Sequence, residues 1–298
     1  MTTTQKAPAS KAAASKSEPE PKPAAKPKSG RASLDQTTEL VRVMYYGDPG
    51  KGKTTAMAGM ARLGKVIFID AERRLKPGPL RRLGVPIENI EVVQDVSYSA
   101  LEALSFELAD RLHGGEPIVG ICWDSATETA RILLQTLVDE SVQQSLRAGK
   151  ERSPWSTAIG DYGDMTEQMR RIIRRFRDLP IHLAVSCLPN RDTDEDGAIR
   201  VAPALTPAVL RDFMGYMDLV FHTRMELVGG VEEYSVLTKP IGKWEAKDSF
   251  GLFPRVLVDP SFDRVLAYVN GEIARDKDPV QKAAAEARRA VTGEETSA

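Results

Sequence analysis

Residues 46–55 have the sequence YGDPGKGKTT, and this stretch decides the fold of the chain. It fits the pattern G-x-x-x-x-G-K-[ST], in which a glycine-rich turn wraps its backbone N–H groups around phosphate oxygens. An apolar run rich in strand formers precedes it at residues 40–45, and residues 55–63 have the composition of a helix. Strand, glycine loop and helix in this order are the context that a phosphate-binding P-loop requires.

The motif predicts ATP and Mg²⁺ as cofactors. Lys53 is expected to reach the β- and γ-phosphates as a catalytic cation, and the Thr54 hydroxyl is expected to bind Mg²⁺. The alternative is a chance match in a turn rich in glycine and lysine. The residues expected to bind the nucleotide are Gly47, Asp48, Pro49, Gly50, Lys51, Gly52, Lys53, Thr54 and Thr55.

Length, composition and charge limit the remaining possibilities. The chain has 298 residues, 42% of them hydrophobic, which is enough for a sizeable core. Its net charge of −1 gives no overall attraction to a polyanion, so such a partner must be bound by local clusters. Cys122 and Cys187 each lie in an apolar run and are expected to be reduced and buried, as in a cytoplasmic protein. No apolar run approaches the roughly 20 residues of a membrane span, so no membrane association is expected.

The composition predicts three segments. Residues 1–34 are rich in alanine, lysine and proline and predict a disordered basic tail, which either solvates the chain or attracts nucleic acid weakly. Residues 35–270 alternate apolar strands with helices and predict one α/β domain, a mostly parallel twisted sheet flanked by helices. Gly229 and Gly230 predict a C-terminal antiparallel hairpin in this domain. Residues 271–298 are expected to form a helical or disordered tail.

Two segments, at residues 65–72 and 117–125, consist of an unalternating apolar run that ends in carboxylates. Such runs are typical of parallel strands that are buried on both faces. In open α/β sheets, ligands bind beyond the carboxyl ends of the strands, where the P-loop also lies. We expect Asp124 to hold Mg²⁺ through a water molecule and Glu72 to orient the attacking water, with Asp70 as the next candidate. The alternative is that these acids cap helices or lie on the surface.

The chain resembles the RecA/Rad recombinase ATPases. The resemblance rests on the P-loop, on the sequence Phe68-Ile69-Asp70-Ala71-Glu72, which is similar to the RecA segment with the catalytic glutamate, and on residues 119–125, which resemble the Walker B strand. It covers roughly residues 40–250 and implies a RecA-like P-loop NTPase fold. Because RecA's N-terminal helix and C-terminal domain are missing, the chain looks most like the compact phage-encoded RecA-like ATPases, a group that includes single-strand annealing proteins.

The resemblance implies an ATPase, stimulated by single-stranded DNA, that acts in phage recombination or strand annealing in the cytoplasm of a bacterial host. Polar loops predicted at residues 148–164 and 189–203 fall where the family has its two DNA-binding loops. The residues expected to contact DNA are Arg152, Trp155, Tyr162, Arg191 and Arg200. Trp155 and Tyr162 would stack on bases; alternatively, they anchor their loop.

The resemblance also implies a homo-oligomer, either a ring or a short filament, with ATP near the subunit interface. Lys239 and Lys243 fall where RecA lysines reach the neighbouring subunit's nucleotide, so they are candidate catalytic residues; alternatively, they are surface lysines flanking a turn. A single-strand-binding protein is a further expected partner. Two other functions stay open: a RecA-fold helicase or helicase loader, and an ATP-gated binding module with negligible turnover.

Overall fold

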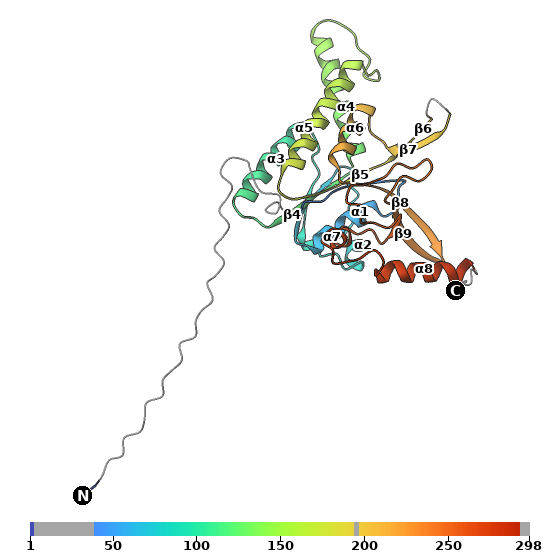
Figure 1. Ribbon diagram of the computed structural model, residues 1–298. Coiled ribbons are helices and arrows are strands. Elements are labelled where there is room, and N and C mark those ends of the chain that lie inside the picture. The colour runs from blue at the N-terminus through green and yellow to red at the C-terminus, as the bar shows by residue number, and fades with distance from the viewer. Residues whose placement is uncertain (3–38, 194–196, 293–298) are drawn as a thin grey trace. The chain divides into compact units, whose positions relative to one another are not determined.

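The computed structural model describes residues 1–2, 39–193 and 197–292. The chain divides into two units between Glu39 and Leu40, and the larger unit, Leu40–Ala298, contains the sheet and its helices (Figure 1). The basic tail predicted at residues 1–34 lies outside the described residues, apart from the first two.

A nine-stranded sheet runs through the larger unit in the order β11–β9–β8–β1–β5–β4–β2–β3, with β10 paired to β8. The strands from β8 to β3 along this order are parallel, whereas β9, β10 and β11 pair antiparallel with their neighbours. This is the mostly parallel α/β sheet that the alternation of strands and helices predicts. The strands are β1 (Arg42–Tyr46), β2 (Lys65–Asp70), β3 (Ile90–Val93), β4 (Ile118–Asp124), β5 (His182–Cys187), β8 (Leu219–Val228), β9 (Val231–Leu237), β10 (Lys247–Asp248) and β11 (Val256–Val258).

Helices cover both faces of the sheet (Figure 1). Met44 and Tyr46 of β1 pack into one apolar core with the larger helices, and Val43 and Tyr45 pack into a second core on the opposite face. The alternation follows from the pleat of a strand, which directs successive side chains to opposite faces. The first core includes α3 (Tyr98–His113), α4 (Ala126–Arg147), α5 (Ile159–Asp178) and α6 (Pro207–Tyr216), and the second includes α1 (Lys53–Ala58), the 3₁₀ turns η2 (Gly59–Arg62) and η3 (Ile87–Asn89), α2 (Pro77–Arg82) and α7 (Phe262–Val269).

The predicted C-terminal hairpin is confirmed. β8 and β9 pair antiparallel up to Val228 and Val231, and only two residues connect them. Gly229 and Gly230 both have positive φ, 59° and 82°. Two consecutive positive φ values are what a tight two-residue hairpin turn demands, and glycine adopts them without strain.

Two regions predicted as polar loops contain regular structure. α5 begins at Ile159, inside the loop expected at residues 148–164, because the Asp161 carboxylate accepts a hydrogen bond from the Ala158 N–H at 2.7 Å and holds the first turn. The loop expected at residues 189–203 is an antiparallel hairpin of β6 (Pro189–Thr193) and β7 (Ile199–Pro203). Its base is fixed because the buried Tyr46 hydroxyl donates to the Val201 carbonyl at 3.1 Å.

The last part of the chain extends the second core. Phe262 and Val265 of α7 are fully buried there. Arg264 of α7 forms a buried ion pair with Asp278, just before α8 (Pro279–Thr292). The cysteines Cys122 and Cys187 are free and buried, as predicted. Within the described ranges, no helix has both the length and the hydropathy needed to cross a membrane.

Candidate nucleotide site

The P-loop connects β1 to α1 at the carboxyl edge of the parallel strands. Gly47 passes so close to β8 that a Cβ atom there would lie 2.3 Å from the Thr223 Oγ1. Gly52 has a φ of 80° and directly precedes α1, and a Cβ atom there would lie 2.8 Å from the Tyr234 ring. Both positions therefore need glycine. Gly47 allows the close approach to β8, and Gly52 allows both a close approach and a left-handed backbone.

Lys53 lies inside the loop that it is predicted to serve. Its Nζ donates hydrogen bonds to the carbonyl oxygens of Gly47 at 2.7 Å and Asp48 at 3.0 Å. Burial lowers the pKa of Lys53, and the nearby Asp124 and Glu72 carboxylates oppose that shift. Among the described residues, this ammonium donates hydrogen bonds to neutral carbonyl groups only, and a phosphate group would offer it a much stronger acceptor.

Thr54 and Asp124 meet, although 70 positions separate them in the chain. The Thr54 Oγ1 donates to the Asp124 Oδ2 at 2.5 Å, and Ser186 of β5 donates to the other carboxylate oxygen. Asp124 is 8% exposed, and burial raises the pKa of its carboxyl group. A hydroxyl and a carboxylate oxygen side by side are hard oxygen ligands of the kind that Mg²⁺ prefers, so this pair fits the predicted ion.

Glu72 lies in the same cavity as these groups. A cavity of about 250 Å³ is lined by residues that include Lys53, Thr54, Glu72 and Asp124. The Ser125 hydroxyl donates to the Glu72 Oε1 at 3.1 Å, which orients the carboxylate. Because this cavity adjoins the loop that would hold the phosphates, a water molecule beside Glu72 would be near the terminal phosphate.

Asp70 has a different role from Glu72. It is 3% exposed, and its two carboxylate oxygens accept hydrogen bonds from the backbone N–H groups of Arg74 and Leu75, both at 3.0 Å. The carboxylate therefore fixes the turn after β2. Asp70 lines a different cavity, of about 490 Å³, with Leu75 and Leu80, whereas Glu72 lines the cavity that contains Lys53, Thr54 and Asp124.

A larger cavity of about 580 Å³ adjoins the other side of the P-loop. Sequence reasoning missed it, because its walls come from three distant segments. Leu83 follows α2, Tyr234 lies on β9, and Pro260 precedes α7, so only the fold brings them together. Flat apolar walls next to a phosphate loop are suited to the base and sugar of a nucleotide. Its lining residues are Gly50, Lys51, Gly52, Lys53, Thr54, Thr55, Ala56, Arg62, Pro79, Arg82, Leu83, Tyr234, Asp259, Pro260 and Ser261.

The residues expected to contact DNA form two separate groups. Arg152 forms an ion pair with Asp161, Trp155 is 92% exposed, and Tyr162 is on α5 rather than in a loop. Arg191 on β6 forms an ion pair with Asp48 of the P-loop at 3.0 Å, and Arg200 on β7 pairs with Glu245 at 2.7 Å.

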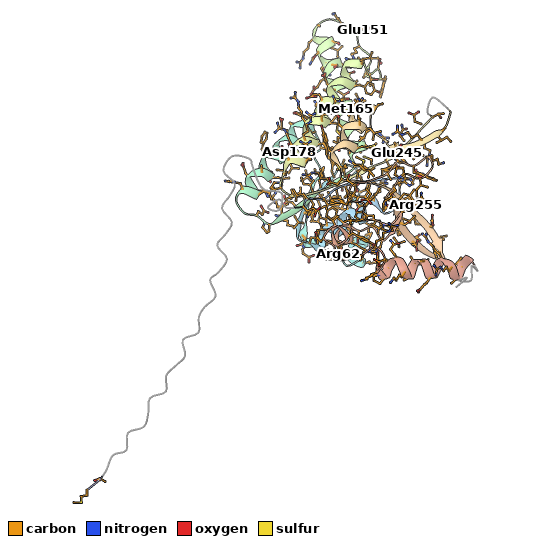
Figure 2. All side chains as sticks on the ribbon, viewed as in Figure 1. Arg62, Glu151, Met165, Asp178, Glu245 and Arg255 are labelled. Carbon is orange, nitrogen blue, oxygen red and sulfur yellow. The ribbon has the colours of Figure 1, made fainter. Side chains whose placement is uncertain are left out.

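The two groups lie apart in space. Figure 2 shows Glu151 at the far end of the α4–α5 pair, well away from Glu245 beside the β6–β7 hairpin. The five residues therefore do not form one compact patch, and only the hairpin group touches the P-loop.

The two lysines expected to act on a neighbouring subunit lie between β9 and β10. Lys243 lines a third cavity and lies over the Trp244 ring, with its Nζ 5.1 Å from the ring centre. Lys239 is half-buried. Neither lysine lines the cavity that contains Glu72 and Asp124, so neither is placed to act on the nucleotide of its own chain.

A mostly parallel sheet, a P-loop at its carboxyl edge and an acid at the end of β4, which β5 separates from β1, define a P-loop nucleotide-binding ATPase. Comparison with known families agrees with this class. A family model described as "AAA domain" matches residues 39–250, which is more than half of the chain. The chain therefore belongs to this family of AAA-domain ATPases. No curated protein matches the chain.

Proposed function

We propose that this protein is a Mg²⁺-dependent ATPase of the RecA-like, phage-encoded type that acts on single-stranded DNA during recombination or strand annealing. The observation that carries the ATPase part is the contact between Thr54 and Asp124, with Glu72 in the same cavity. These three side chains come from two different strand ends and from the P-loop. Their convergence supports hydrolysis as well as nucleotide binding.

The phosphate end of the site is built for charge stabilisation. Mg²⁺ would be held at Thr54 and, through water, at Asp124, and would neutralise charge on the β- and γ-phosphates. Lys53 would exchange its carbonyl partners for phosphate oxygens, where negative charge grows as the γ-phosphate leaves. Ser186 donates a hydrogen bond to the Asp124 carboxylate and so holds it in position.

The attacking water would be oriented by Glu72. The carboxylate accepts a hydrogen bond from the water and turns an oxygen lone pair towards the γ-phosphate. Ser125 holds one carboxylate oxygen, which leaves the other to the water molecule. The Arg74 Nη1 lies 3.8 Å from this second oxygen and would add a positive charge beside the water molecule.

Single-stranded DNA is proposed as the partner on two grounds. The exposed Trp155 offers a flat face on which any base can stack. The arginines on the β6–β7 hairpin offer cations that can track phosphates. Because Arg191 touches Asp48 of the P-loop, a ligand on the hairpin and a nucleotide in the loop would act on the same ion pair.

Assembly into a ring or a short filament, with a single-strand-binding protein as a further partner, belongs to the same proposal. Lys239 and Lys243 support it, because neither lines the cavity that contains Glu72 and Asp124. In an assembly, they would supply cations to the γ-phosphate of the neighbouring subunit. This arrangement would make turnover depend on protein concentration.

The test is ATP turnover of the full chain, measured with and without Mg²⁺ and with and without a single-stranded oligonucleotide. We expect turnover to require Mg²⁺ and to rise when the oligonucleotide is added. Turnover that the oligonucleotide leaves unchanged, together with no binding of the oligonucleotide at low salt, would contradict the DNA part of the proposal. Unwinding of a tailed duplex would instead identify a helicase.

A further inference from the structure

A third cavity, of about 340 Å³, lies on the opposite side of β1 from the cavity with the catalytic acids. Its walls are the first half of the P-loop, the β6–β7 hairpin, the middle of β8 and the turn that contains Trp244. We name it the β8 cavity, and its lining residues are Asp48, Lys51, Pro189, Arg191, Val201, His222, Thr223, Arg224, Met225, Glu226, Lys243 and Trp244.

The β8 cavity carries a surplus of positive charge. Four of its side chains are cationic and two are acidic. Arg191 pairs with Asp48, and Arg224 pairs with Glu226. Among the described residues, the other two cations, Lys51 and Lys243, have no carboxylate within ion-pair distance. An anion in this cavity would therefore meet Lys51 and Lys243 directly and would compete with Asp48 and Glu226 for Arg191 and Arg224.

A buried polar atom without a partner also belongs to this cavity. His222 is 9% exposed, and within the described part of the chain its Nδ1 has no hydrogen-bond partner. Burial, with a smaller contribution from the nearby Arg224, lowers the pKa of His222 to about 4, so the ring is neutral at physiological pH. A buried nitrogen left unpaired costs free energy, and a ligand that bonds to it would recover that cost.

The cavity also has an aromatic wall. The Trp244 ring packs against the His222 ring, with 5.7 Å between the ring centres and an angle of 37° between the planes. Trp244 is only half-buried, which leaves part of its ring available to a ligand. Cations, one unpaired polar nitrogen and an aromatic face together match a nucleotide unit, with its phosphate, its polar edges and its flat base.

We propose that the β8 cavity binds one nucleotide of a single strand, with its phosphate on Lys51, Arg191 and Arg224 and its base against Trp244. This inference rests on the proposed action on single-stranded DNA and locates the contact beside the P-loop. The size fits one nucleotide, because 340 Å³ is at the small end of ligand pockets.

This position explains how a strand and ATP would affect each other. Arg191 can pair with Asp48 or with the bound phosphate, and Asp48 and Lys51 belong to the loop that wraps the ATP phosphates. Strand binding would therefore release Asp48 and change the loop next to Lys53. By reciprocity, ATP would change the affinity for the strand by the same factor.

The first experiment measures binding of a labelled oligothymidylate to the full chain by fluorescence anisotropy, with a non-hydrolysable ATP analogue present. Arg224→Gln removes the charge and keeps a polar side chain, and we expect it to weaken binding about tenfold, since it removes a hydrogen bond to a charged group. The matched control is Arg211→Gln on α6, an exposed arginine that lines none of the three cavities, and we expect it to change affinity less than twofold.

The second experiment needs no variant. The unaltered protein is photocrosslinked to an oligonucleotide that contains bromodeoxyuridine, and the attached peptide is identified by mass spectrometry. We expect crosslinks at Trp244. Crosslinks confined to Trp155 and Tyr162, with Arg224→Gln equal to its control, would overturn the cavity assignment and leave the DNA function standing.

A third measurement separates the two levels of the proposal. Thymidine 5′-monophosphate is titrated against the unaltered protein and against Arg224→Gln. Binding of the mononucleotide that depends on Arg224, without any binding of the oligonucleotide, would keep the β8 cavity as a nucleotide site and overturn the action on single strands. Binding of neither probe would overturn both.

Discussion

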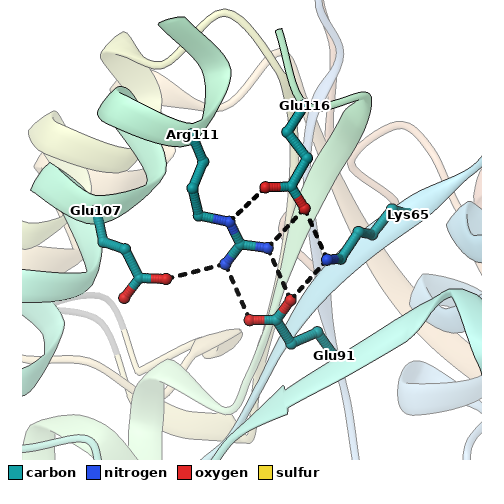
Figure 3. Close-up of polar contacts among 5 residues, drawn as sticks. All are labelled: Lys65, Glu91, Glu107, Arg111 and Glu116. Carbon is teal, nitrogen blue, oxygen red and sulfur yellow. Dashed lines mark hydrogen bonds and ion pairs between the residues drawn. The ribbon is translucent and has the colours of Figure 1, made fainter. Parts of the chain in front are cut away.

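The two ends of the parallel strands both gather charged residues, and they use them in opposite ways. At the amino end, Lys65 and Arg111 form five ion pairs with Glu91, Glu107 and Glu116, with distances between 2.7 and 3.0 Å (Figure 3). At the carboxyl end, Lys53 donates hydrogen bonds to two carbonyl groups, and the Glu72 carboxylate faces a cavity. The first cluster satisfies its own charges, whereas the second leaves its charges for a ligand.

The difference shows how a charged cluster can be interpreted. Arg111 donates to all three of its acids, so the amino-end cluster has little capacity left for another molecule. Its location at the starts of β2 and β4 also puts it away from the edge where open α/β sheets bind ligands. The five charged residues at the amino end therefore form a structural clamp, and the more loosely connected set around the P-loop is the one that we propose to bind the nucleotide.

The largest effect should come from Lys53→Ala. No other side chain of the loop donates into it from this position, so the variant should lose ATP binding or all measurable turnover. Binding is measured by titration with a fluorescent ATP analogue, and turnover by phosphate release. The matched control is Lys65→Ala at the amino end, which should keep turnover. Parental turnover in purified Lys53→Ala would contradict the P-loop assignment.

Glu72→Gln should have the next largest effect. The amide keeps the size of the side chain but cannot accept a proton or hold the water as strongly, so turnover should fall at least tenfold, which is about 1.4 kcal/mol in the barrier. Nucleotide affinity should be unchanged, because Glu72 lies beyond the phosphate loop. Single-turnover kinetics and equilibrium binding separate the two quantities. Glu91→Gln is the control, and equal turnover in both variants would mean that the water is oriented by another group.

Most of the fold followed from local signals in the sequence. Unalternating apolar runs identified β2 and β4, because a strand buried on both faces has no polar face to alternate with. The glycine pair identified the β8–β9 hairpin. The sequence analysis predicted no helix at α7, although Phe262, Val265 and Val269 recur there at the spacing of one helix face.

The sequence predicted only those parts of the site whose residues lie close together in the chain. The P-loop could be predicted from its motif. The acids at the ends of β2 and β4 could be predicted because each terminates a recognisable apolar run. The walls of the larger cavity are not, since Leu83, Tyr234 and Pro260 are brought together by sheet order and by α7 packing. The β6–β7 hairpin was missed because its strands are polar and mostly exposed, and its position depends on one buried tyrosine, Tyr46.

A smaller effect is expected when the amino-end clamp is broken by Arg111→Met. The pairs of Arg111 are partly exposed, so the free energy of unfolding should fall by only about 1 kcal/mol. Turnover per folded molecule should not change, because the clamp and the site lie at opposite ends of the strands. Chemical denaturation of the variant and its parent gives the difference, and a loss of turnover without a loss of stability would contradict this separation.

The clamp also predicts the direction of a pH effect. Contacts with Arg111 lower the pKa values of Glu91 and Glu116 from 4.5 to about 2 in the folded protein. Stabilisation by these carboxylates is therefore present above pH 4.5 and is lost as the pH falls from 4.5 to 2. Arg111→Met should be closest to its parent at the acid end of this range. If the difference in unfolding free energy between Arg111→Met and its parent grew as the pH fell, the result would contradict this prediction.

The smallest effect is expected from Arg191→Ala, and it tests whether the carboxyl end is open to a polyanion. Arg191 is exposed, and its ion pair with Asp48 contributes little to stability, so folding should be unaffected. If Arg191 exchanges Asp48 for a DNA phosphate, its removal releases one counterion fewer on binding, and the slope of log affinity against log salt should flatten by about one unit. Anisotropy of a labelled oligonucleotide across a salt series measures that slope. Arg175→Ala on α5 is the control, because Arg175 already pairs with Glu102 on the helical face, and its slope should match the parent. An unchanged slope for Arg191→Ala, with binding intact, would mean that the hairpin arginine stays with Asp48 and that the strand follows another surface.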